Sequence, residues 1–324
     1  MATADQIKSL IRSHYSNQIE RFYTIALQVA AHEAKQGHAA LAHDIRLIVD
    51  AERKKIGPKN LNFPQDLRGL VLTEESQVSQ SALVIPDTLR ERIQQIIHEY
   101  RQQEKLKAFG LSHRRKILLI GPPGTGKTMT ARVLSKELHI PLYTIQVDRL
   151  VTKFMGETSA KLRQIFELMQ QKHGVYLFDE FDAIGGERSM DNDVGEMRRV
   201  LNAFLQFIEQ DNSDSLVVAA TNNPRLLDQA LFRRFDDVLY YEAPTEEERK
   251  HLMANVLETF LSPGFAWQQV LADSDGLSHS EIVQACLDVI KKTILADESK
   301  VNANSLAAAI QNRQLFHKSL RDKK

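Results

Sequence analysis

The sequence predicts an α/β protein with a central parallel sheet and helical segments before and after it. Three observations lead to this prediction. Short, nearly continuous apolar runs alternate with helical segments in the middle of the chain, which is typical of parallel strands covered on both faces. Residues 4–55 contain almost no Gly or Pro and carry apolar residues at helical spacing. Beyond Pro244 the pattern is helical only.

The N-terminal segment is expected to form two or three antiparallel helices. Its apolar residues recur at helical spacing, at Ile19, Phe22, Tyr23, Ala26, Leu27 and Ala30, and Gly37 separates them from the next periodic stretch. Residues 56–66 concentrate Pro, Gly and Asn, which indicates a linker. Residues 1–65 are therefore predicted to be a helical domain with its linker.

The middle of the chain contains five apolar runs of strand length. They are KILLI at 116–120, PLYTIQV at 141–147, VYLFD at 175–179, SLVVAA at 215–220 and DVLYY at 237–241. A further strand candidate, LVLT at 70–73, precedes a long amphipathic helix expected over 87–106. Residues 66–244 are predicted to form the α/β domain, and residues 245–324 a smaller helical domain.

Composition narrows the class of protein. Lys plus Arg and Asp plus Glu both number 42, so no global basic field attracts nucleic acid or anionic lipid. The single cysteine, Cys286, lies in an apolar helical stretch and fits a reducing compartment. The N-terminus has no signal-like apolar run, and no stretch reaches the roughly 18 apolar residues of a membrane helix. A cytoplasmic protein that does not bind membrane is expected; the charge balance weakens a nucleic-acid-binding function but leaves it as an alternative.

GPPGTGKT, residues 121–128, directly follows the strand KILLI and opens a helix. This spacing in a strand-loop-helix context predicts a phosphate-binding loop, where glycines let backbone amides approach the phosphates and the helix N-terminus favours negative charge. Lys127 is expected to reach the β and γ phosphates of ATP, and the Thr128 hydroxyl to hold Mg²⁺. The predicted nucleotide-binding residues are Gly121, Pro122, Pro123, Gly124, Thr125, Gly126, Lys127, Thr128 and Met129.

Two carboxylates, Asp179 and Glu180, follow the strand VYLF. Side chains at the carboxyl end of a parallel strand face the crevice where ligands bind. Asp179 is predicted to support Mg²⁺ together with Thr128. Glu180 is predicted to orient and polarise the attacking water.

Polar residues after the later strands complete the predicted site. Asn222 follows SLVVAAT and could help to hold the water, although an ordinary Asn turn is the alternative. Arg233 and Arg234 are adjacent, and a neighbouring subunit could use them at its own γ phosphate. The alternative for this arginine pair is a surface ion-pair site.

The motifs GPPGTGKT, LFDEFDAIG, AATNNPRLLDQALFRRFD and KFMGETSAKLRQIFELM occur in this order, and over residues 85–310 the chain resembles the AAA branch of the AAA+ ATPases. The resemblance implies a P-loop NTPase core, a C-terminal lid domain and a hexameric ring with ATP at subunit interfaces. It also implies Walker A roles for Lys127 and Thr128, Walker B roles for Asp179 and Glu180, sensor 1 for Asn222, and arginine fingers at Arg233 and Arg234.

One triplet departs from the family pattern. Many members have Gly-Ala-Asp where this chain has His279, Ser280 and Glu281. No arginine occurs there, which puts a charged second sensor in doubt. His279 could pack near the adenine or face solvent.

The resemblance assigns KFMGE, residues 153–157, to a pore loop that grips polypeptide. Phe154 would contact side chains of any sequence through apolar surface, with Lys153 and Met155 beside it. The alternative is that Phe154 and Met155 belong to the core of a short loop.

The whole chain also resembles bacterial ATPases encoded beside a subtilisin-like serine protease in antiphage defence and plasmid-maintenance modules. This resemblance implies an unfoldase that works with a separate protease, with residues 1–65 selecting the partner or substrate. An N-terminal appendage that only stabilises the ring is an alternative. A further alternative for the chain is a nucleotide-dependent switch that activates or restrains a protease without threading polypeptide.

Overall fold

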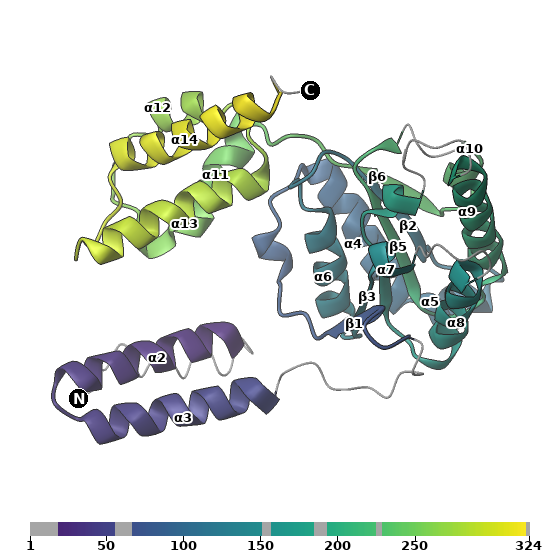
Figure 1. The fold of residues 1–324 in the computed structure, drawn as a ribbon, viewed down its shortest axis with the longest axis horizontal. Coiled ribbons are helices and arrows are strands. Elements are labelled where there is room, and N and C mark those ends of the chain that lie inside the picture. The colour runs from purple at the N-terminus through teal and green to yellow at the C-terminus, as the bar shows by residue number, and fades with distance from the viewer. Residues whose placement is uncertain (1–18, 56–66, 151–156, 185–192, 225–228, 322–324) are drawn as a thin grey trace.

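The computed structural model describes residues 19–55, 67–150, 157–184, 193–224 and 229–321. These residues form an N-terminal helical hairpin, an α/β unit built on one sheet, and four C-terminal helices (Figure 1). No helix in these described ranges is long and apolar enough to cross a membrane.

The sheet has six strands in the order β1-β3-β4-β5-β2-β6. Its strands are β1 (Val71–Glu74), β2 (Lys116–Ile120), β3 (Leu142–Ile145), β4 (Val175–Phe178), β5 (Leu216–Thr221) and β6 (Asp237–Tyr240). All neighbours from β3 to β6 pair in parallel, which confirms the predicted parallel sheet. At the edge, β1 pairs with β3 in the antiparallel direction.

Helices cover both faces of this sheet (Figure 1). Val175 and Leu177 of β4 pack in the core with α4 (Asp87–Arg101) and α6 (Lys127–Leu138). Tyr176 and Phe178, which alternate with them, pack in the other core with α8 (Glu157–Gln171) and α9 (Asp193–Gln210). Because successive residues of a strand point to opposite faces, a strand covered on both sides must be apolar throughout.

The single helix predicted over 87–106 is wrong, because two helices occupy this segment. The helix α4 ends at Arg101, and the short α5 (Gln103–Ala108) follows. Gln102 between them has φ −105° and ψ 18°, outside the helical region.

Short elements complete the α/β unit. They are α7 (Val147–Leu150), α10 (Gln229–Phe232) and the 3₁₀ turns η2 (Gln80–Ala82) and η3 (Phe181–Ile184). The turn η3 comes directly after the carboxylates at the end of β4 and places Asp182 near them.

The C-terminal helices enclose an apolar core of their own. They are α11 (Glu246–Leu257), α12 (Trp267–Asp273), α13 (His279–Leu295) and α14 (Ala303–Arg321), with the turn η5 (Glu258–Phe260) after α11. Capping boxes start two of them, Thr245 with Glu248 at α11 and Ser278 with Glu281 at α13. Each box satisfies backbone N–H groups that have no partner within the helix, so these helices begin at defined residues.

The N-terminal hairpin consists of α2 (Ile19–Lys35) and α3 (Ala39–Lys55). Tyr23, Ala26 and Val49 form its small core. On α3, Leu47 and Ile48 are 53% and 63% exposed. Two helices of the predicted hairpin are thus present, with apolar side chains on its surface.

Candidate functional site

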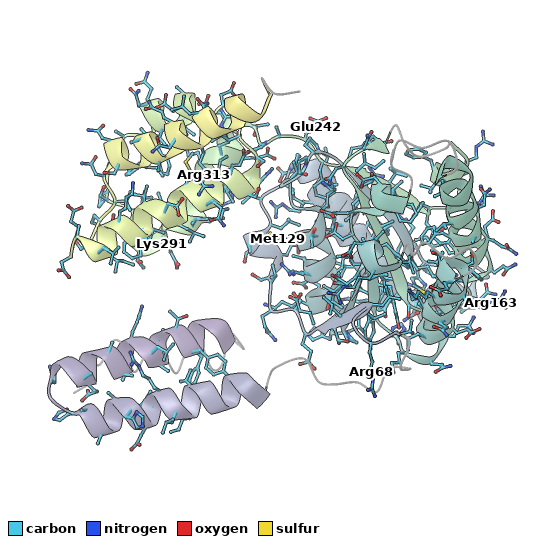
Figure 2. All side chains as sticks on the ribbon, viewed as in Figure 1. Arg68, Met129, Arg163, Glu242, Lys291 and Arg313 are labelled. Atoms are coloured by element: carbon cyan, nitrogen blue, oxygen red, sulfur yellow. The ribbon has the colours of Figure 1, made fainter. Side chains whose placement is uncertain are left out.

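A cleft of about 1490 Å³ lies between the α/β unit and the C-terminal helices. The phosphate-binding loop, Asp179, Glu180 and Asn222 line it from the α/β unit. Met129, at the start of α6, also faces the cleft (Figure 2). Residues from α11 and α13 line the opposite wall, so both units take part in one site.

The loop after β2 adopts a conformation that requires glycine. Gly124 and Gly126 have φ of 74° and 104°, in the left-handed region. A Cβ atom at Gly124 would lie 2.2 Å from the Ser280 Oγ atom of α13. Gly126 is the N-cap of α6, so the loop runs directly into the helix N-terminus. The result is a cradle of backbone at the positive end of a helix, which is suited to phosphate.

Lys127 is buried at the base of this cradle, with 6% of its surface exposed. Its Nζ donates to the carbonyl oxygens of Gly121 at 2.8 Å and Pro122 at 2.7 Å. Burial lowers the pKa of Lys127, and the charges of Asp179 and Asp182 oppose that shift. The loop carbonyls thus hold the ammonium group where phosphate oxygens could become its partners.

The residues predicted to hold magnesium are in contact. The Thr128 Oγ1 donates to Asp179 Oδ2 at 2.7 Å, and the backbone N–H of Glu180 donates to Asp179 Oδ1 at 3.0 Å. A hydroxyl and a carboxylate oxygen beside a phosphate cradle match Mg²⁺, which takes few protein ligands and shares phosphate oxygens. This donor set therefore fits Mg²⁺ bound together with ATP.

Glu180 and Asn222 reach the same cleft from the ends of neighbouring strands β4 and β5. Glu180 is exposed and has φ of 52°, an unusual conformation for a residue other than glycine. The backbone N–H of Asn222 donates to Asp182 Oδ1 at 3.3 Å, which holds the Asn222 turn beside the carboxylates. The sequence placed these residues at strand ends, and the sheet order brings them together.

The remaining predicted residues lie elsewhere. Arg233 is exposed, and Arg234 forms an ion pair with Glu209 at 2.8 Å. Neither arginine lines the cleft of its own chain. Lys153, Phe154 and Met155 fall outside the described residues, and the pore-loop assignment stays a prediction.

The sequence prediction missed two features of the cleft, the wall segment just before α4 and the contact of α13 with the phosphate loop. Leu83, Val84 and Ile85 line the cleft just before α4, in a segment that reads only as a break between elements. The backbone N–H of Ser280 donates to the Gly124 carbonyl at 3.0 Å, so α13 contacts the phosphate loop directly. The apolar triplet before Pro86 could have indicated the wall segment before α4. No local pattern predicts the contact between α13 and the phosphate loop.

The chain matches the family model described as ATPase family associated with various cellular activities (AAA) over residues 117–243. It is 31% identical over 325 residues to an uncharacterized AAA family ATPase, y4kL, of Sinorhizobium fredii, covering 96% of each chain. It is 32% identical over 206 residues, 62% of this chain and 55% of the relative, to a putative 26S proteasome regulatory subunit homolog of Methanothermobacter marburgensis.

A further relative is the ATP-dependent zinc metalloprotease FtsH 1 of Symbiobacterium thermophilum, at 30% identity over 261 residues. The match covers 78% of this chain and 44% of that relative. The loop, the carboxylates and the full-length similarity to y4kL agree: this chain belongs to the AAA family of ATPases and hydrolyses ATP.

Proposed function

We propose that this chain is a protein unfoldase or remodeller that works as a hexameric ring and uses Mg-ATP to pull on polypeptide. The contact between Ser280 N–H and the Gly124 carbonyl carries this proposal, because it joins the phosphate loop to the C-terminal helices. A change at the phosphates is thereby transmitted to helices α11–α14, which act as a lid. Motion of a lid with the nucleotide state is what a pulling machine requires.

The relatives support this reading through their names. One is named as a proteasome regulatory subunit homolog and another as an ATP-dependent protease. We propose that this ATPase likewise works with a peptidase, a separate subtilisin-like serine protease that is the second component of a defence module. Residues 66–244 act as the motor and residues 245–324 as the lid. The N-terminal domain, residues 1–65, docks that partner or the substrate.

The first test of threading uses Phe154. Unfolded casein is expected to stimulate ATP turnover by the wild-type ring, and Phe154→Ala should reduce the ratio of stimulated to basal turnover to about one, because the apolar grip is lost. Phosphate release with and without casein measures this ratio. Phe109→Ala, at a phenylalanine that is 77% exposed beyond α5, is the matched control and should keep the stimulation. Full stimulation in Phe154→Ala would favour a switch that does not thread polypeptide.

A second test asks whether arginines act across subunits. Because Arg233 is exposed and lines no part of its own cleft, Arg233→Ala should slow hydrolysis about 10³- to 10⁵-fold, the range known for arginine fingers. Mixing it with Lys127→Ala protein should restore part of the activity, since some interfaces then combine an intact Arg233 with an intact loop.

The control for this mixing experiment is Arg234→Ala, which also removes the ion pair with Glu209. A smaller loss in Arg234→Ala would show that Arg233 supplies most of the effect. Turnover of the mixture that equals the sum of the two separate variants would rule out sharing of sites between subunits.

A further inference from the structure

Arg249 is a buried arginine of the C-terminal helices that lies outside the lining of the nucleotide cleft. It belongs to the first turn of α11. Its Nη1 donates a hydrogen bond to the Pro244 carbonyl at 3.0 Å, and its Nε donates to the Ser274 Oγ at 3.1 Å. One guanidinium group therefore joins three segments of the chain, namely the connection between β6 and α11, α11 itself, and the turn between α12 and α13.

An ion pair alone does not explain this buried charge. Asp275 Oδ1 lies 3.2 Å from Nη1 of Arg249, but the side chain of Asp275 is 80% exposed, so water screens the attraction. The two buried hydrogen bonds go to uncharged oxygens, a carbonyl and a hydroxyl. At such a position an apolar side chain of similar size is often neutral or stabilising. What arginine adds is geometry, because the N–H groups of its planar fork point in fixed directions.

The connection between the two units is held at both of its ends. Tyr241 follows β6, and its buried hydroxyl shares a hydrogen bond of 2.6 Å with the Thr130 Oγ1 of α6, the helix that begins at the phosphate loop. Pro244 is held by Arg249 on the side of the C-terminal helices. Only residues 242–243 separate these two held positions. A change in the angle between the units is therefore concentrated at residues 242–243.

Arg249 also fixes the turn that leads into α13. Ser274, which accepts the hydrogen bond from Nε of Arg249, is fully buried. Four residues later, Ser278 is the N-cap of α13, and the N–H of Ser280 donates to the Gly124 carbonyl of the phosphate loop. The position of Ser280 against Gly124 therefore depends on a turn that Arg249 ties to α11 and to the connection.

We propose that Arg249 is a positioning residue for ATP binding, which holds the C-terminal helices in one orientation on their connection so that Ser280 meets the Gly124 carbonyl. Without the guanidinium fork, the turn before α13 shifts, and the wall formed by α11 and α13 no longer closes on the nucleotide in a fixed position. The carboxylates Asp179 and Glu180 belong to the α/β unit, so the chemical step is affected much less than binding. The proposal requires only that the chain binds and hydrolyses ATP, and it holds whether or not polypeptide is threaded.

Steady-state phosphate release and thermal unfolding of the full chain test this proposal. Arg249→Met removes the fork but keeps a long side chain, so the Tm should not fall. The KM for ATP should rise about 3- to 10-fold, the effect of roughly one hydrogen bond. The kcat should change less than about twofold, as expected when only binding is lost. Ser274→Ala removes one of the two bonds and should raise KM by a smaller factor.

Arg249→Lys separates geometry from charge. Lysine keeps the positive charge, but its single nitrogen cannot hold the Pro244 carbonyl and the Ser274 hydroxyl in the arrangement of the fork, so KM should stay raised. The matched control is Arg313→Met on α14 (Figure 2), which makes the same replacement in an ion pair with Asp288 of α13 and should leave KM unchanged.

Three results would overturn the proposal. One is a wild-type KM in both Arg249→Met and Ser274→Ala, and Ser274→Ala alone decides this if Arg249→Met does not fold. Another is an equal rise of KM in Arg313→Met, which would show that any lost arginine in these helices has the same effect. The third is a joint fall of Tm and kcat in Arg249→Met, which would show that Arg249 only supports the fold. A wild type without turnover would instead contradict the ATPase activity itself.

Discussion

Replacing Glu180 with glutamine is expected to slow ATP hydrolysis about 10²- to 10⁴-fold, the usual contribution of a general base, while ATP binding persists. Glu180 lines the cleft beside Asn222 at the ends of adjacent strands, where an attacking water would lie. Asp179 is already engaged by Thr128 and by the Glu180 backbone, which leaves Glu180 as the carboxylate expected to orient the water. Glutamine keeps the shape of the side chain but cannot take a proton.

The measurement combines phosphate release with a binding titration. Glu180 has a positive φ of 52°, and glutamine meets the same backbone strain as glutamate, so a change in rate reports chemistry and not folding. Glu242→Gln, at an exposed glutamate after β6 (Figure 2), is the control and should hydrolyse ATP normally. A Glu180→Gln protein with wild-type turnover would remove Glu180 from the reaction.

Lys127→Ala is expected to have the largest effect on nucleotide binding. The ammonium group lies at the base of the loop and bonds to the Gly121 and Pro122 carbonyls. Two charge-assisted hydrogen bonds to phosphate oxygens are worth roughly 3–6 kcal/mol. Their loss should weaken ATP binding about 10²- to 10⁴-fold.

A titration with a fluorescent ATP analogue measures this loss. Lys127→Arg keeps the charge but replaces a compact ammonium with a planar group, and should recover only part of the affinity. Lys250→Ala, at an exposed lysine on α11, should bind as the wild type does. Equal affinity in Lys127→Ala and wild type would place the phosphates elsewhere.

The break in the helix predicted over 87–106 shows the limit of periodicity. The apolar spacing continues past Arg101, but Gln102 leaves the helical region. Its neighbours are held by distant residues: Glu99 accepts hydrogen bonds from Arg114, and Arg101 donates to the Glu137 carbonyl. Burial raises the pKa of Glu99, but the hydrogen bonds and charge of Arg114 outweigh it and lower the pKa to about 2. Contacts of this kind join segments far apart in the chain, so a local pattern does not reveal them.

The sequence by itself determined the phosphate loop and the positions of the carboxylates, because each depends on a short strand-loop segment whose pattern is local. Tertiary structure decided which strand ends meet. Only the order β4-β5-β2 brings Glu180 and Asn222 to the loop after β2. It also decided that α13 touches Gly124 and places His279 in the cleft. That contact joins residues more than 150 positions apart, and packing of the C-terminal helices against the α/β unit creates it.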